Sequence, residues 1–372
     1  MVNKLSPRVI YAYLAVVTTL VIVYFGKPVL MPLAIAAVLA IVFTPLCRRL
    51  EKAGVNSTLS AILCGALFAL IFGGLVFFVV FYFKQIVTDL SGIKQNILEY
   101  NHYVKKYLHD SFGVNAQGGK SSIPVPFEPD GQGIGKMATS VMGLALSIVI
   151  DLVLINVYLV MLLCIRGQIK LFILRLVWPA GRDQAKDIIS RCSSVVRNYL
   201  IGLAIVIVFL WIMYSIGFSI VGIHYALFFA VLCGLLEIVP FVGNITGSTL
   251  TSIMALSQGG GMGMVAGVLI TYALIQFIQF YIITPLIMRD QVNIHPIFTI
   301  LVLITGDLIW GIPGMILAIP LLGIIKIVCD NVGSLEPLGY LLGHHNKHKQ
   351  RSWSWLRKIG RRHTEPPAPP TV

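Results

Sequence analysis

The sequence predicts an all-α polytopic membrane protein with about six full transmembrane helices and two opposed re-entrant helical hairpins, about eight hydrophobic segments in all. Hydrophobic residues make up 57% of the 372 residues and charged residues 12%, and the mean hydropathy is +0.87, far from the usage of water-soluble domains. Several runs reach the roughly 20 apolar residues that cross a bilayer. Two further apolar segments are interrupted in the middle by Gly and Pro, which predicts hairpins there.

The N-terminal part, residues 1–83, contains three apolar runs at about 9–26, 29–45 and 58–83, each of which predicts a membrane-spanning helix. Basic residues precede the first run, as they do in a signal peptide. The run is long, however, and has no small-residue cleavage site, so we expect a retained helix. The very short connection at 27–28 predicts that the first two helices are antiparallel neighbours.

The next two segments differ in polarity. Residues 84–140 predict an extracytoplasmic amphipathic helix followed by a loop rich in Gly, Pro and Ser, to which we assign no chemistry. Residues 141–198 predict a fourth spanning helix, about 141–165, and a strongly basic loop. Apolar residues within 169–178 indicate that part of this loop lies as a helix in the membrane interface, with a solvated linker as the alternative.

The basic residues of the chain gather in the loops between apolar runs and in the tail, residues 331–372. The positive-inside rule therefore predicts a cytoplasmic N-terminus and a cytoplasmic C-terminus. It also accounts for the net charge of +13 without a nucleic-acid partner. The partners that we expect are the lipid bilayer and a small-molecule or ion substrate.

Residues 199–330 predict a transport core built from two units. A helix at about 199–221 is followed by a broken segment at 225–257, and a helix at about 262–287 is followed by a second broken segment at 296–329. Arms of about 15 residues reach roughly 23 Å, less than the 30 Å of the hydrocarbon core. We therefore expect one hairpin to enter from the outside and the other from the inside, an inverted repeat that is typical of transporters.

The tips of these hairpins are the predicted substrate site, because half-helices that end near the midplane offer free backbone groups to a ligand. Polar side chains beside the first tip suit a small polar solute. The alternative is that Gly and Pro only kink ordinary spans of a channel or scaffold. The predicted site residues are Glu237, Pro240, Phe241, Gly243, Asn244, Thr246, Gly311, Pro313 and Gly314.

Acidic residues inside apolar segments are candidates for proton or cation coupling, because a charge in the bilayer costs at least a few kcal/mol. Glu237 and Asp307 precede the two breaks by about one turn each, and Asp151 lies in the fourth helix. The alternative role is a structural hydrogen bond to freed backbone groups. Asp330 is expected at the membrane interface.

Other classes of function are disfavoured because the sequence lacks their motifs. A P-loop, an HExxH motif and a GxSxG motif in a suitable setting are missing from the sequence, so we expect neither direct ATP use nor an enzyme. The six cysteines form no CxxC pair and predict neither disulfides nor a zinc site. We predict no catalytic residue, no metal and no cofactor, and we expect His295 to begin a helix.

The C-terminal half contains a series of spaced Gly, Pro, aromatic and His positions, namely Tyr199 and Gly202, Pro240 to Gly243, Thr284 and Pro285, His295 and Pro296, and Gly311, Gly314 and Pro320. In these positions it resembles the autoinducer-2 exporter (AI-2E) family of bacterial inner-membrane transporters, and hydropathy extends the resemblance to the whole chain. The resemblance implies a homo-oligomer, a pentamer, whose protomers work by an elevator movement. It implies small signalling molecules as substrates for some members and exchange of sodium or lithium for protons in others.

Three positions depart from the family pattern. Gln279 stands where the family often carries an acid, Arg289 stands where it often has Gly, and Asp151 is unusual for the family. The presence of Gln279 in place of an acid argues against ion coupling through the helix at about 262–287.

The sequence as a whole predicts a transporter of the bacterial inner membrane that exports a small polar organic solute such as autoinducer-2. A Na+(Li+)/H+ antiporter is the alternative, and an oligomeric membrane scaffold without transport is a second alternative.

Overall fold

The computed structural model describes residues 7–90, 131–239, 242–287 and 294–343. This part of the chain is helical, apart from turns and one isolated bridge between Ile294 and Gly343. The α-helices are α1 (Pro7–Phe25), α2 (Lys27–Lys52), α3 (Ser57–Leu90), α5 (Gly131–Leu176), α6 (Arg182–Val221), α7 (Ala226–Leu236), α8 (Val242–Ser257), α9 (Gly261–Ile278), α10 (Thr284–Ile287), α11 (Pro296–Trp310), α12 (Ile312–Asn331) and α13 (Glu336–Leu342). The short helices are η1 (Pro179–Gly181), the π-helix η2 (Gln279–Ile283) and η3 (Gly333–Leu335).

The predicted all-helical membrane class is confirmed. Six helices of the described ranges are long and apolar enough to cross a bilayer. Five of them correspond to predicted spans, but the sixth is α12, which was expected to be a short arm of the second hairpin. The helix continues through the buried Pro320 for 20 residues, and 20 residues at 1.5 Å each reach about 30 Å. The six segments are Lys27–Lys52, Ser57–Ile86, Met142–Leu176, Arg182–Val221, Gly261–Ile287 and Ile312–Asn331.

The basic stretch before residue 199 is more helical than the sequence indicated. α5 continues to Leu176 and α6 begins at Arg182, with only a short turn around Pro179–Gly181 between them. Charged residues do not stop a helix, whereas Pro and Gly do, so the break falls at the Pro and Gly. The expected amphipathic helix in 84–140 falls mostly on residues 91–130, outside the described part of the chain.

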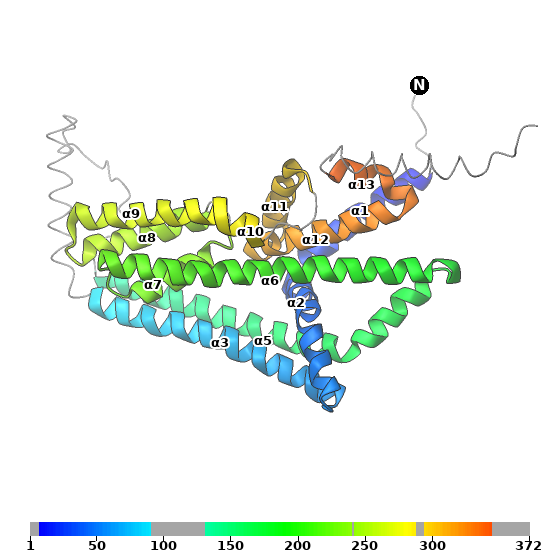
Figure 1. Ribbon diagram of the computed structural model, residues 1–372, viewed down its shortest axis with the longest axis horizontal. Coiled ribbons are helices and arrows are strands. Elements are labelled where there is room, and N and C mark those ends of the chain that lie inside the picture. The colour runs from blue at the N-terminus through cyan, green and yellow to red at the C-terminus, as the bar shows by residue number, and fades with distance from the viewer. Residues whose placement is uncertain (1–6, 91–130, 240–241, 288–293, 344–372) are drawn as a thin grey trace, which may run out of the picture.

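One apolar cluster joins α2, α3 and α5. Phe68 of α3 is buried against Leu159 and Leu163 of α5, and Cys47 of α2 packs in the same cluster. Figure 1 shows α3 and α5 running side by side, with α2 crossing near their ends. We call these three helices the N-terminal bundle.

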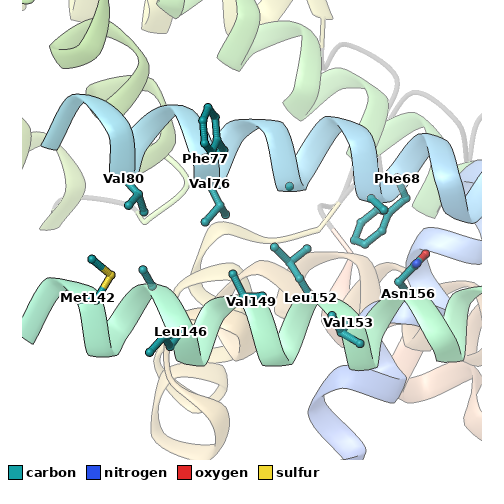
Figure 2. A pocket seen from close by; sticks show the side chains of 13 residues that line it. Phe68, Val76, Phe77, Val80, Met142, Leu146, Val149, Leu152, Val153 and Asn156 are labelled. Carbon is teal, nitrogen blue, oxygen red and sulfur yellow. The ribbon is translucent and has the colours of Figure 1, made fainter. Parts of the chain in front are cut away.

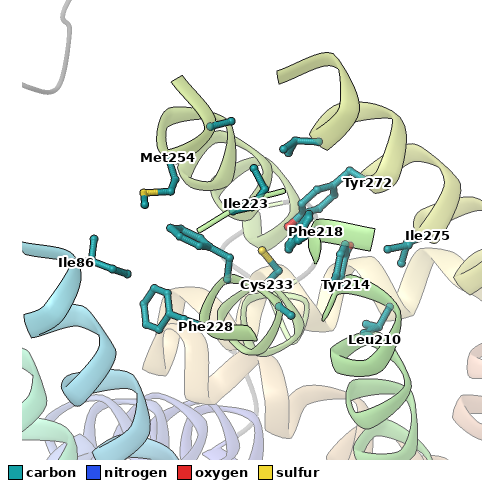
Figure 3. Packing of buried hydrophobic residues seen from close by; sticks show 14 of the residues in the cluster. Ile86, Leu210, Tyr214, Phe218, Ile223, Phe228, Cys233, Met254, Tyr272 and Ile275 are labelled. Carbon is teal, nitrogen blue, oxygen red and sulfur yellow. The ribbon is translucent and has the colours of Figure 1, made fainter. Parts of the chain in front are cut away.

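A second apolar cluster joins α6, α7, α8 and α9, which we call the hairpin bundle (Figure 3). Tyr214 of α6 and Tyr272 of α9 have ring centroids 4.8 Å apart, and both are buried. The last turns of α3 reach this cluster through Tyr82, whose ring centroid lies 6.3 Å from that of Phe228 in α7. The two clusters share no buried residue. They are connected by the last turns of α3, where Ile86 is buried in the second cluster, and by a small third cluster of Val38 from α2, Val196 from α6 and Leu317 from α12.

The second broken segment also folds as a helical hairpin. Gly311 ends α11 and begins α12 with φ +68°, a conformation that L side chains rarely adopt. The arms touch at the backbone near this turn, where a Cβ atom at Gly314 would overlap the carbonyl oxygen of Gly306. The sequence therefore identified the turn of this hairpin correctly.

Candidate functional site

The turn between α7 and α8 brings two helix ends into backbone contact. Gly243 donates its amide hydrogen to the carbonyl of Val239, with 3.0 Å between nitrogen and oxygen. A Cβ atom at Gly243 would overlap the carbonyl oxygen of Leu236, so only glycine fits this position without displacement of the backbone. The turn holds Glu237, which caps the C-terminal end of α7, beside Asn244 in the first turn of α8.

The Glu237 carboxylate accepts hydrogen bonds from three side-chain amides. Oε1 accepts from Asn244 Nδ2 at 3.3 Å and from Gln279 Nε2 at 3.1 Å. Oε2 accepts from Gln276 Nε2 at 3.1 Å. Gln276 Nε2 also lies 2.7 Å from Asn244 Oδ1 and 3.4 Å from the Tyr214 hydroxyl. We call Glu237, Asn244, Gln276, Gln279 and Tyr214 the polar cluster.

The polar cluster joins every helix of the hairpin bundle. Tyr214 comes from α6, Glu237 from the end of α7, Asn244 from α8, and Gln276 from α9. Gln279 begins the π-helix η2, and such wide turns often occur at functional sites because they free a backbone group. A movement of α7–α8 against α9 would therefore break hydrogen bonds to Glu237.

The electrostatics of the cluster are unusual for a membrane protein interior. Among the described residues no Lys, Arg or His forms an ion pair with Glu237, so amide dipoles alone solvate its carboxylate. The Oε1 atoms of Gln276 and Gln279 are buried and have no hydrogen-bond partner in the described part of the chain. A carboxylate next to unpaired carbonyl oxygens can bind a proton or a cation, or accept hydrogen bonds from the hydroxyl groups of a solute.

The other end of the α7–α8 hairpin is pinned to the loop after α6. The Gln258 side chain accepts from the amide of His224 at 2.8 Å and donates to the carbonyl of Gly222 at 3.1 Å. Asn244 lies about 20 Å along α8 from Ser257, at 1.5 Å per residue. The polar cluster is thus set deep between apolar helices, at the turn of the hairpin.

The structure brings together only part of the predicted site. Glu237, Gly243 and Asn244 meet at the α7–α8 turn, whereas Thr246 is exposed on α8. Pro240 and Phe241 lie outside the described residues. Three predicted residues, Gly311, Pro313 and Gly314, form the separate α11–α12 turn, and the two predicted acids Asp307 and Asp151 are exposed on α11 and half-buried on α5.

The positions that matched the family pattern have varied structural roles. His295 caps the N-terminal end of α11 and its Nδ1 accepts from the amide of Ile297 at 3.4 Å, which confirms that it begins a helix. Pro296 occupies the first turn of α11, Pro320 is buried within α12, and Pro285 lies in α10. Gly202 is buried in α6 and Tyr199 is half-buried there. Asp330, expected at the interface, accepts from Lys326 at 2.6 Å.

Sequence reasoning missed Gln276 and Tyr214 as members of the cluster. The available signal was the spacing of Gln276 and Gln279, because two amides three residues apart share one face of a helix. In an apolar helix such a pair needs polar partners. Among the described residues no group of three or more His, Cys, Asp or Glu side chains could hold a metal.

A cavity of about 380 Å³ lies between α3 and α5, away from the polar cluster (Figure 2). Its lining is apolar except for Asn156 at one end, as Figure 2 shows. Apolar walls cannot hydrogen-bond a polar solute. We therefore assign the candidate site to the polar cluster.

Comparison with known proteins agrees with this assignment to transport. The model of the AI-2E family transporter matches residues 13–333. "Putative transport protein YueF" of Bacillus subtilis is 24% identical over 85% of this chain and 87% of its own length. "Putative permease PerM" of Escherichia coli K12 is 25% identical over 87% of this chain and 93% of its own length. The family match covers most of the chain and its six apolar helices, and the chain therefore belongs to the AI-2E family of membrane transporters.

Proposed function

We propose that this membrane transporter exports a small polar organic solute such as autoinducer-2, with the polar cluster as part of its binding site. The observation that carries the proposal is the set of three amides around Glu237 at the α7–α8 turn. A carboxylate, amides and a phenol recognise hydroxyl-rich solutes through hydrogen bonds, and apolar helices around them exclude water. Each hydrogen bond of this kind contributes about 0.5–1.5 kcal/mol, or 1.5–3 kcal/mol where a charge takes part.

The mechanism that we propose is an elevator movement of the hairpin bundle against the N-terminal bundle. The two bundles have different apolar clusters, and the last turns of α3 meet α7 through Ile86 and through the ring of Tyr82, which lies against the rings of Tyr225 and Phe228. Ring contacts can slide and re-form at low cost, which suits rigid-body movement between packed units. The substrate would travel with the polar cluster.

In this proposal the two hairpins enter the bilayer from opposite sides, α7–α8 and the arm α11 as re-entrant segments, while α12 has the length of a full span. The arms α7, α8 and α11 contain 11, 16 and 15 residues, too few to cross about 30 Å of hydrocarbon. We propose that both termini lie in the cytoplasm of a bacterium, as the basic loops favour, and that the protein lies in the inner membrane. The family resemblance supports a homo-oligomer, a pentamer. Glu237 is the coupling residue in this scheme, and Asp307 and Asp151 are further candidates for proton or cation coupling.

A second function, Na+(Li+)/H+ exchange, is favoured by one observation. The carboxylate of Glu237 lies beside amide groups whose Oε1 atoms have no partner among the described residues. Hard cations prefer oxygen ligands of this kind. The carboxylate could bind either a cation or a proton, so the release of one would accompany the binding of the other.

Proteoliposomes that contain the purified protein separate these functions. We expect autoinducer-2, loaded inside, to leave faster than from protein-free liposomes, with a rate that saturates as its concentration rises. If the protein instead dissipates an imposed pH gradient only when sodium or lithium is added, and no solute moves, the exchanger is the correct function. If neither flux exceeds that of empty liposomes, both proposals fail and the alternative of an oligomeric scaffold is favoured.

A further inference from the structure

A second cavity lies where α2, the last turns of α5 and the first turns of α6 meet, with a volume of about 940 Å³. Figure 1 shows these three helix segments arranged as the sides of a triangle. The end of α12 contributes Ile324 and Val328 to the wall. No residue of the polar cluster lines this cavity.

The cavity is strongly basic. Its lining contains seven Lys and Arg side chains and neither Asp nor Glu. Two of the seven have acidic partners outside the lining, since Arg166 pairs with Glu51 and Lys186 with Asp183. Like charges that gather around one space repel each other unless an anion is present, so this lining favours a bound anion.

Three of the bases are free to bind such an anion. Arg49 of α2, Lys170 of α5 and Arg197 of α6 come from three sides of the cavity, and no hydrogen bond or ion pair joins their side chains to another described residue. Ser193 and Ser194 line the same space and add hydroxyl groups. Arginine, lysine and serine are the side chains that proteins use to bind phosphate groups.

The deeper wall of the cavity has the opposite character. Ala37, Ala40 and Ile41 of α2 and Leu162 of α5 face it, together with Ile324 of α12. Ala37, Ala40 and Ile41 lie in the middle of α2, whereas Arg49 lies in its last turn and Lys170 lies near the end of α5. The apolar wall therefore lies further from these helix ends than the bases do, at the depth where we place a lipid acyl chain. A ligand that fits both parts is charged at one end and apolar at the other.

We propose that this cavity binds the phosphate headgroup of an anionic membrane phospholipid, whose acyl chain lies along the apolar wall. Basic pockets between transmembrane helices are suited to such headgroups, and each base near the membrane surface adds to the attraction. Because α2 belongs to the N-terminal bundle and α6 to the hairpin bundle, the lipid bridges the two. The proposal does not depend on the identity of the transported solute.

The test uses the purified full-length protein in neutral detergent, with dioleoyl phosphatidylglycerol, dioleoyl phosphatidylcholine and inorganic phosphate as separate probes. The variant is Arg49→Gln, Lys170→Gln and Arg197→Gln combined. The matched control is Arg175→Gln, Arg182→Gln and Arg191→Gln combined, which removes the same charge from α5 and α6 at residues outside the lining. Binding is followed by the shift in Tm and by the lipid that copurifies per protomer.

We expect phosphatidylglycerol to raise the Tm of the wild type and of the control, and phosphatidylcholine to raise it much less. The cavity variant should bind phosphatidylglycerol at least about tenfold more weakly. An equal loss in the control, or unchanged binding by the cavity variant, overturns the proposal. An equal Tm shift with millimolar inorganic phosphate also overturns it, because the site then takes a soluble anion. If the triple variant does not fold, Lys170→Gln alone, at an exposed position, gives the same comparison.

Discussion

Glu237→Gln is expected to lower the initial rate of solute efflux from proteoliposomes at least about tenfold. The change keeps the shape of the side chain but replaces one carboxylate oxygen with the NH2 group of an amide. Three amide donors surround this carboxylate, so the new N–H would face at least one N–H of Asn244, Gln276 or Gln279. A charge-assisted hydrogen bond contributes about 1.5–3 kcal/mol, and the loss of 1.4 kcal/mol is a tenfold effect.

The matched control is Glu336→Gln, which removes the same charge from an exposed position on α13. It should leave efflux unchanged. Both variants should elute as folded protein with the wild-type Tm, because Glu237→Gln also removes the cost of a buried charge. Normal efflux by Glu237→Gln would show that the polar cluster takes no part in transport.

Gly243→Ala is expected to destabilise the hairpin bundle by about 1–3 kcal/mol, the range found when an atom is forced into a filled space. The added methyl group would overlap the carbonyl oxygen of Leu236. A carbonyl of the main chain cannot rotate away as a side chain can, so the α7–α8 turn must open. This opening would also move Glu237 and Asn244 apart, so efflux should fall together with Tm.

Gly263→Ala in α9 provides the control for the second prediction. The structure leaves open space around Gly263, with no heavy atom within 4 Å of an added Cβ. This variant should equal or slightly exceed the wild-type Tm, because Ala favours a helix over Gly by about 1 kcal/mol. Equal stability of the two variants would contradict the close approach of the arms at Gly243.

Hydropathy and the helix-breaking residues Gly and Pro predicted most of the fold, because both determine structure locally along the chain. Uncharged runs of sufficient length identified five of the six apolar spans, and Gly311 was recognised as the turn of the second hairpin. The end of α5 was predicted too early and the start of α6 too late, since charge marks the membrane surface but does not end a helix. α12 is longer than the predicted arm because it begins directly after Gly311 and includes Pro313, which a helix accepts in its first turn.

The candidate site was predictable only in part. Glu237 and Asn244 stood out because they are polar residues beside a break in an apolar segment. Gln276 and Tyr214 lie 39 and 23 positions from Glu237 in the sequence, and how α9 and α6 are rotated against α7 decides whether they meet it. That rotation depends on the packing of rings such as Tyr272 and Phe218, which the sequence of a single helix does not reveal.

The central claim is that the hairpin bundle moves against the N-terminal bundle during transport. Tyr82→Cys with Phe228→Cys places two thiols across this boundary, where the native rings lie 6.3 Å apart. The most direct test measures solute efflux after a reversible bifunctional thiol reagent joins them, and again after reduction. The wild type, treated in the same way, controls for the six free cysteines. We predict that efflux falls to the leak of empty liposomes while the bundles are joined and recovers on reduction. Undiminished efflux through the cross-linked protein would contradict the movement.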